Sequence, residues 1–316
     1  MSSITRRRFA GGAAALAVVT ALSPWGGGSA QPAGGRTRLV LLGTGGGPRV
    51  TATGRAKPAT LIIASGVPYV VDCGDGVALQ LARAGVALNA LRYVFITHHH
   101  SDHNLDYGNL VYDGWVAGLR TPVDAYGPPP LKAMTEAYWQ LNRFDIETRI
   151  ADEGRVDLRK LLTAHEFAEP GPVMQNADVK VSAARVRHPP IAHAYAYRFD
   201  AADRSIVISG DTTWSPELIA LARGADVLVS EAMHLAGLES LLKRVPNAAT
   251  LREHLLASHI VTEDLGKLAA EAGVKTLVLS HLVPGDDASI TDAMWAEGVR
   301  KHYGGQIIVG RDLLEV

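Results

Sequence analysis

One short segment of this chain concentrates side chains that bind metal ions, with four histidines and one aspartate inside residues 97–103. Four of these donors follow an H-x-H-x-D-H spacing: His98, His100, Asp102 and His103. The segment directly follows the apolar run Tyr93–Ile96, which we predict to be a buried strand of a parallel or mixed sheet. A rigid strand that ends in a loop can turn several side chains toward one point. These donors suit two borderline divalent ions, and a solvated polyhistidine loop is the alternative.

Three further candidate ligands each come directly after a predicted strand. They are His188 after residues 181–186, Asp211 after residues 205–208, and His281 after residues 276–279. We expect strand ends from two sheets to bring these donors close to the histidine segment. Imidazoles together with two carboxylates suit a pair of divalent ions, Zn²⁺ first, with Mn²⁺ or Fe²⁺ as alternatives.

Strand and helix signals alternate through the rest of the chain. Residues 60–63 and 68–71 predict a hairpin, residues 77–84 a helix that ends at Gly85, residues 226–229 a strand, and residues 263–272 a helix capped by Thr262. Helices placed between strands imply sheets that are covered on their outer faces. The chain has 316 residues, of which 47% are hydrophobic, so it can bury a large core.

Several motifs, in the same order, resemble those of the metallo-β-lactamase superfamily, in its ribonuclease Z and arylsulfatase-like branch. The matching segments are Leu42-Gly43-Thr44-Gly45-Gly46, residues 69–76, residues 97–103, Arg187-His188, Ser209-Gly210-Asp211-Thr212 and Leu279-Ser280-His281. The resemblance covers about residues 37–316. It implies an α/β fold, the αββα sandwich of two packed mixed sheets with helices outside and the site at one edge.

The resemblance also implies how the donors are shared between two divalent ions. One ion is held by His98, His100 and His188, the second by Asp102, His103 and His281, and Asp211 bridges them. Two ions of this kind lower the pKa of a shared water, so that hydroxide becomes available as the nucleophile. They also stabilise negative charge that develops on the substrate. The two carboxylates, Asp102 and Asp211, are therefore predicted to be catalytic as well as ligands.

His259 lies 22 residues before His281 and resembles a histidine of the ribonuclease Z branch that is not a ligand and assists the leaving group. The segment Ser230–Met233 resembles that branch's His-Glu-Ala-Thr motif, with its first and last residues changed. By this resemblance Glu231 orients His259, and the protonated imidazole donates a proton to a departing alkoxide or phenoxide. A helix-capping or surface histidine is the alternative, and we assign no role to His254.

We predict an exported metal-dependent hydrolase of small phosphodiester or aryl sulfate esters. A lactonase or β-lactamase-type hydrolase, a ribonuclease Z-like endoribonuclease and a non-catalytic metal-binding scaffold are the alternatives. Acidic and basic residues nearly balance over residues 131–174, which favours a small anionic substrate over nucleic acid. Tyr138, Trp139 and Phe144 in this region suit an apolar lid, a subunit contact in a homodimer or the core of a helix.

The first thirty residues are typical of a twin-arginine secretory signal. Consecutive arginines precede the apolar run Ala10–Leu22, and Gly28-Ser29-Ala30 has the small residues of a cleavage site. We therefore expect a periplasmic or secreted protein without a membrane segment after cleavage, an uncleaved anchor being the alternative. Residues 31–36 are predicted to be a linker, and residues 37–316 the hydrolase domain. Cys73 is the single cysteine of the sequence, so an intramolecular disulfide is excluded, and we predict that its side chain is small and buried.

Overall fold

The structure, a computed structural model, describes residues 35–51 and 54–316. The predicted signal segment, residues 1–30, lies outside these residues, as does most of the predicted linker. All described residues belong to one unit of the chain. Within them, no helix is both long enough and apolar enough to cross a membrane.

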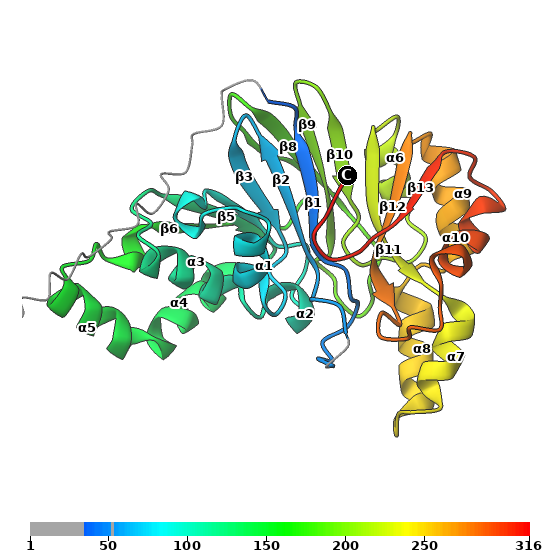
Figure 1. The fold of residues 1–316 in the computed structure, drawn as a ribbon, viewed down its shortest axis with the longest axis horizontal. Coiled ribbons are helices and arrows are strands. Elements are labelled where there is room, and N and C mark those ends of the chain that lie inside the picture. The colour runs from blue at the N-terminus through cyan, green and yellow to red at the C-terminus, as the bar shows by residue number, and fades with distance from the viewer. Residues whose placement is uncertain (1–34, 52–53) are drawn as a thin grey trace, which may run out of the picture. The chain divides into compact units, whose positions relative to one another are not determined.

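Two seven-stranded sheets pack face to face (Figure 1). The first sheet has the order β14 (Leu314–Glu315), β1 (Arg38–Gly43), β2 (Ala59–Ala64), β3 (Val67–Val71), β4 (Tyr93–Phe95), β5 (Val123–Gly127) and β6 (Leu162–Glu166). The second has the order β13 (Gln306–Val309), β12 (Thr276–Val283), β11 (Val227–Met233), β10 (Ser205–Ile208), β9 (Tyr195–Ala201), β8 (Val179–Arg185) and β7 (Gly171–Gln175). Each sheet thus comes from one half of the chain, except that β14 returns to pair with β1.

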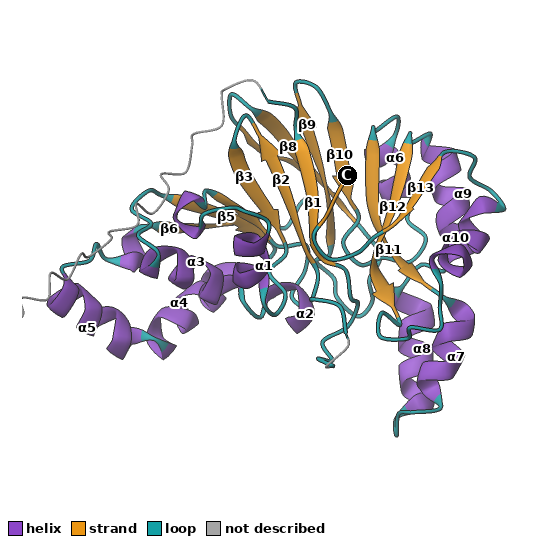
Figure 2. Cartoon of the chain, in the orientation of Figure 1, coloured by secondary structure: helices purple, strands orange, loops and turns teal. Residues whose placement is uncertain are grey.

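Helices cover the outer face of each sheet, which completes the expected αββα sandwich (Figure 2). The first half contributes α1 (Val77–Arg83), α2 (Ser101–Asn104), α3 (Tyr107–Val116), α4 (Leu131–Leu141) and α5 (Arg143–Glu153), with short 3₁₀ turns at Leu88–Ala90 and Leu158–Lys160. The second contributes α6 (Pro216–Ala222), α7 (Leu235–Leu242), α8 (Ala248–Ser258), α9 (Thr262–Ala272) and α10 (Asp292–Arg300). The predicted fold class is confirmed.

Most interior strands are apolar because both faces of each sheet are covered there, whereas the edge strands β6 and β7 carry polar, partly exposed residues. In β1, Val40 and Leu42 pack against the helices, whereas Leu39 and Leu41 face the second sheet. Aromatic rings fill the space between the sheets, where Phe95 makes edge-to-face contacts with rings of β9. The central strand β4 pairs in parallel with β3 and β5, as its short apolar run predicted.

Several predicted elements differ in detail from the structure. Asp102 and His103 lie in the short helix α2 and not in an open turn. The helix α9 begins at Thr262 itself, and its N-cap Val261 offers no capping side chain, so the predicted cap is wrong. Trp139 is a core residue, whereas the Phe144 side chain is 85% exposed on α5.

Candidate metal centre

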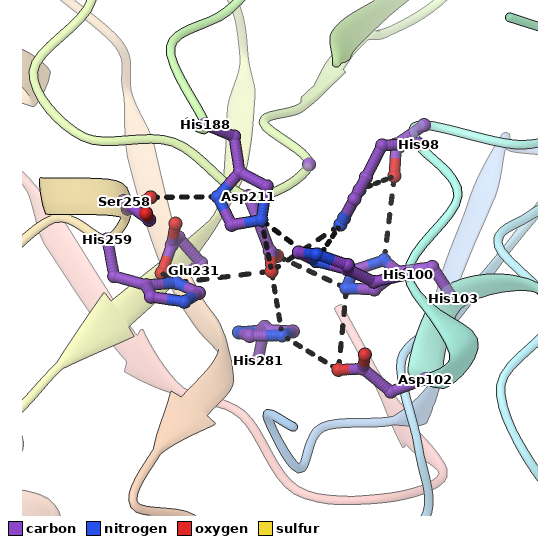
Figure 3. A network of polar contacts seen from close by, with 12 residues as sticks. His98, His100, Asp102, His103, His188, Asp211, Glu231, Ser258, His259 and His281 are labelled. Atoms are coloured by element: carbon purple, nitrogen blue, oxygen red, sulfur yellow. Dashed lines mark hydrogen bonds and ion pairs between the residues drawn. The ribbon is translucent and has the colours of Figure 1, made fainter. Parts of the chain in front are cut away.

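The seven predicted ligands converge at one edge of the sandwich, where strands of both sheets end (Figure 3). One group of potential ligand atoms comes from His98, His100, His188 and Asp211, a second from Asp102, His103 and His281, and a third from Asp211, His259 and His281. Within each group, the ligand atoms lie within 4.8 Å of one another. The first two groups contain the three donors that the family resemblance implies for each ion, and Asp211 lies in the first and third groups.

Three imidazoles of the first group point at a common centre. The Nδ1 atom of His100 lies 3.1 Å from Nε2 of His98 and 3.0 Å from Nε2 of His188. The carboxylate of Asp211 closes this group, with Oδ2 3.8 Å from Nε2 of His98 and 3.9 Å from Nε2 of His188. Three ring nitrogens and a carboxylate oxygen are a donor set that suits a borderline ion such as Zn²⁺.

The second group shares Asp211 with the first. Its Oδ1 atom lies 3.3 Å from Nε2 of His103, and its Oδ2 atom lies 3.2 Å from Nε2 of His281. Asp102 joins this group through Oδ2, which is 3.3 Å from the same His281 nitrogen. The buried atoms Nε2 of His103 and Oδ1 of Asp211 make no hydrogen bond. Buried polar atoms are rarely left without partners, and a divalent cation would satisfy both.

Hydrogen bonds on the side away from the centre fix the Nδ1 atoms of two of the imidazoles, His188 and His103. His188 donates from Nδ1 to the carbonyl of Ser258 over 2.9 Å, and Nδ1 of His103 lies 2.8 Å from Oδ2 of Asp72. Such bonds fix the ring orientation and leave Nε2 free to face the centre. The sequence prediction did not assign a role to Asp72. Its position directly after the apolar strand β3, like that of Asp211 after β10, was the signal that could have found it.

His281 is aimed at the centre by a bulge inside β12. The prediction placed it after the end of a strand, but β12 continues to Val283, so that part of the prediction is wrong. The register with β11 shifts there, since Ser280 pairs with Glu231 and Leu282 with Ala232. His281 has a φ of 39°, in the left-handed region that non-glycine residues rarely adopt. The extra residue turns the imidazole out of the alternation of the strand.

The protonation states of the donors follow from their burial and from their neighbours. Burial lowers the pKa of His98 and His100, and it lowers the pKa of His188 to about 4. Burial alone would also lower the pKa of His103, but nearby carboxylates, Asp211 first, outweigh it and raise that pKa well above its ordinary value. The carboxylates that attract this proton would attract a metal cation in its place.

The predicted Glu231–His259 pair is present beside the donors. His259 follows α8 in extended backbone, and its Nδ1 lies 2.7 Å from Oε2 of Glu231 and 3.9 Å from Oδ2 of Asp211. Burial, followed by the charge of Asp211, raises the pKa of the Glu231 carboxyl well above its ordinary value. Burial also lowers the pKa of His259. Both shifts favour the neutral forms of the two side chains, a carboxyl group hydrogen-bonded to Nδ1 of a neutral imidazole.

A cavity of about 390 Å³ lies against these donors. Its lining includes Asp102, Asp211 and His281 of the centre, His254 and His259 from the α8 region, and Lys57 and Arg49 from the loop that follows β1.

His254, like Asp72, is a residue for which the sequence predicted no role. Its spacing of four residues from Ser258 along one helix face was the only signal for it. Tyr138, Trp139 and Phe144 do not line this cavity. Cys73 is buried, as predicted, and burial raises the pKa of its thiol.

Comparisons with known proteins agree with this geometry. A family model described as the Beta-lactamase superfamily domain matches residues 69–282. A ribonuclease Z from Mycobacterium sp. (strain KMS) is 35% identical over 280 residues, which covers 88% of this chain and 95% of the relative. A ribonuclease Z from Mycobacterium marinum is 32% identical over 281 residues, or 88% of this chain and 97% of the relative.

Two solved structures share the fold at low sequence identity. The metallo-β-lactamase fold protein YhfI from Bacillus subtilis superposes with a TM-score of 0.65 at 19% identity, covering 89% of this chain and 100% of that chain. The short form of human tRNase Z superposes with a TM-score of 0.65 at 18% identity, covering 88% of this chain and 98% of that chain.

Proposed function

Because this chain belongs to the ribonuclease Z branch of the metallo-β-lactamase superfamily of metal-dependent hydrolases, we propose that it hydrolyses phosphodiester bonds at a pair of divalent metal ions. The observation that carries this proposal is the position of the Glu231–His259 pair. It faces Asp211, the carboxylate that lies between the two donor groups. A proton donor at such a place can serve a poor leaving group such as an alkoxide.

In this proposal the predicted ligand assignment is kept in full. One ion is held by His98, His100 and His188, the other by Asp102, His103 and His281, with Asp211 between them. When bound, such ions supply a water of lowered pKa and accommodate the charge that develops on phosphoryl oxygens. Zn²⁺ suits a set of imidazole nitrogens with few carboxylates, and Mn²⁺ or Fe²⁺ remain alternatives.

The proton required by the leaving group comes from the chain itself. Glu231 holds Nδ1 of His259, so the opposite ring nitrogen, Nε2, is the one available to a substrate. As the ester bond breaks, His259 donates its Nε2 proton to the departing oxygen. Glu231 transfers its proton to Nδ1 in the same step, so that no net charge accumulates on the buried imidazole.

A second candidate function, ribonuclease Z-like cleavage of RNA, is favoured by the relatives, whose names say ribonuclease Z at 35% and 32% identity. The names of these relatives count against our prediction that the substrate is a small ester and not a nucleic acid. The small ester class, including aryl sulfates, stays part of the proposal, because a cavity of about 390 Å³ can hold a single small ligand. Both candidates require the same ions and the same Asp211.

Metal analysis with a substrate panel tests the proposal. We expect close to two divalent ions per chain, and zinc- or manganese-dependent hydrolysis of bis(4-nitrophenyl) phosphate. A precursor tRNA and an aryl sulfate tested alongside would identify the substrate class. Asp211→Ala should lower turnover by several orders of magnitude and reduce metal content, because both donor groups lose a shared ligand. Wild-type turnover and metal content in this variant would contradict the ligand assignment.

We further propose that residues 1–30 direct twin-arginine export and are then removed. Fractionation of cells that express the full chain tests this. Replacing Arg6 and Arg7 by lysine should leave an uncleaved precursor in the cytoplasm, whereas periplasmic accumulation of that variant would oppose the route. The predicted homodimer stays a prediction, and light scattering of the purified protein would check it.

A further inference from the structure

We propose that the cavity beside the metal centre contains a subsite for one apolar substituent of the ester, formed by the hairpin of α7 and α8. This inference rests on the proposed phosphodiesterase function, and it names the kind of substrate. The subsite is lined by five aliphatic side chains, which we call the apolar wall: Leu241, Val245, Leu251, Leu255 and Val283. An ester with one anionic phosphoryl group and one aromatic or branched alkyl group would occupy both parts of the cavity.

The apolar wall belongs to a separate hydrophobic cluster. Its members pack on Met233, Leu238 and Leu242, away from the clusters that hold the two sheets and their outer helices together. Figure 1 shows α7 and α8 side by side as a hairpin beyond the end of β11. Leu241, Val245 and Leu251 remain partly exposed in this packing and line the cavity. Burial of such surface by an apolar ligand is favourable.

One face of α8 leads from the apolar wall to the reacting groups. Leu251, His254, Leu255 and Ser258 are spaced three or four residues apart, so they lie on the same side of the helix. His259 follows directly, with its ring centroid 5.1 Å from that of His188. A phosphoryl group at the metal centre therefore places an attached substituent along this face, against the leucines.

The remaining lining carries charge of both signs, with Lys57 and Arg49 near Asp286. Lys57 lines the cavity although only 8% of it is exposed, and its Nζ donates to the carbonyl of Arg49 over 2.5 Å. These two basic residues, with the metal ions, would balance the charge of a phosphoryl group. A volume of about 390 Å³ has room for that group together with an aromatic ring.

Binding of two phosphonates that differ only in their apolar group tests the subsite. Phenylphosphonate and methylphosphonate are titrated into the zinc-loaded full protein by calorimetry, at a pH where both are fully ionised. We expect phenylphosphonate to bind at least about tenfold more tightly. Leu251→Asn should remove most of this preference and leave the affinity for methylphosphonate nearly unchanged.

The matched control is Leu256→Asn, which changes an exposed leucine of the same helix that does not line the cavity. It should keep the wild-type preference. Val245→Asn, in the loop between α7 and α8, is the second wall variant and serves if Leu251→Asn does not fold. Equal binding of the two phosphonates by the wild type, or an equal loss in the control variant, would overturn the subsite.

Calorimetric binding of the phosphonates does not depend on turnover. The phosphodiesterase function and the apolar subsite can therefore be contradicted independently of each other. A zinc-loaded protein that cleaves no phosphodiester yet prefers phenylphosphonate would contradict the proposed function and support an apolar anion site. A protein that cleaves phosphodiesters but shows no preference would contradict the subsite alone. Tight binding of RNA with equal phosphonate affinities would overturn it in favour of the ribonuclease.

Discussion

At the scale of single residues, His259 and the seven donors lie in the same buried cluster and yet have different surroundings. Each donor directs a ligand atom at other donors, whereas the Nδ1 atom of His259 is bound by Glu231 at 2.7 Å. The carboxylate makes His259 a poor candidate for metal binding through that nitrogen. Its place in the third donor group comes from proximity to Asp211 and His281.

Replacing His259 should therefore separate proton donation from metal binding. His259→Ala should keep near-normal metal content and slow esters with alkoxide leaving groups by about 10²–10⁴-fold. A 4-nitrophenyl ester should be affected much less, because its leaving group departs without a proton. Steady-state kinetics and metal analysis of the same preparation measure both effects.

His165→Ala is the matched control, since His165 pairs with Asp124 in the first sheet at 2.7 Å and does not line the cavity. This variant should hydrolyse esters with alkoxide and with 4-nitrophenolate leaving groups at the wild-type rates. Equal losses with good and poor leaving groups in His259→Ala, or loss of metal, would assign His259 to the ligands.

The spacing of the histidine segment and the strands before the other donors predicted the seven ligands, and the family resemblance predicted the Glu231–His259 pair. No role was predicted for Asp72, although it lies in the matching segment of residues 69–76, or for His254. Asp72 acts through Thr97 and His103, which are 25 and 31 residues away in the chain. Contacts at this separation depend on the packed sheets, so the sequence shows where Asp72 lies but not which side chains it contacts.

At the scale of elements, the apolar runs predicted which strands exist better than where they end. The run at residues 276–279 ends at a polar residue, but the strand continues because Ala232 and Met233 of β11 pair with Leu282 and Val283. The sequence pattern also did not predict the bulge at His281, because the alternation of a strand has a period of two and does not reveal one extra residue. The site depends on that bulge.

Gly46 supports the bulge by its lack of a side chain. A Cβ atom at this position would come within 2.8 Å of Cε1 and 2.9 Å of Nδ1 of His281. Gly46→Ala should therefore displace the imidazole and lower the affinity for the second ion, by about 10-fold or more. Competition for zinc with a chromogenic chelator measures the change.

Gly304→Ala is the control for this prediction, because a Cβ atom there meets nothing within 4 Å. It should bind zinc as the wild type does. An unchanged zinc affinity in Gly46→Ala would mean that the loop moves freely and does not fix His281.

Asp226 joins the beginnings of three neighbouring strands. It accepts hydrogen bonds from the backbone and hydroxyl of Ser205 and from Nζ of Lys275. The Lys275 ammonium, and then the Ser205 bonds, hold the pKa of Asp226 below its ordinary value of 3.8. A carboxyl with a lowered pKa contributes stability above its unfolded pKa and loses it as the pH falls below that value.

Asp226→Asn should thus destabilise the metal-free protein by about 1 kcal/mol at pH 7, after allowance for partial exposure. The difference between wild type and variant should persist at pH 5 and shrink as the pH falls below 4. Urea unfolding at each pH measures it. A difference that grows on acidification would contradict the sign of the pKa shift.

At the scale of the whole molecule, the centre joins the two halves of the sandwich. The histidine segment and Asp102 follow β4 of the first sheet, whereas His188, Asp211 and His281 come from the second. Ions held between these donors would bind only the folded protein, since the unfolded chain does not hold them together.

Removal of metal should therefore lower the melting temperature. At a zinc concentration about 100-fold above the dissociation constant, linkage adds about 2.7 kcal/mol per site, and so about 5 °C or more for a protein of this size. Calorimetric scans with zinc, and with a chelator, measure the shift. Asp211→Ala should show a much smaller difference between the two scans, and an equal difference would contradict binding at this centre.

The separation of the donors along the chain also sets the order of events during synthesis. Asp102 and His281 are 179 residues apart, and their contact is part of the centre. Contacts of such long range form late, after both sheets have paired. A chain that is still being made holds the histidine segment long before β12 exists, so it cannot close the centre. The centre with both donor groups is thus complete only after both halves of the chain have been made.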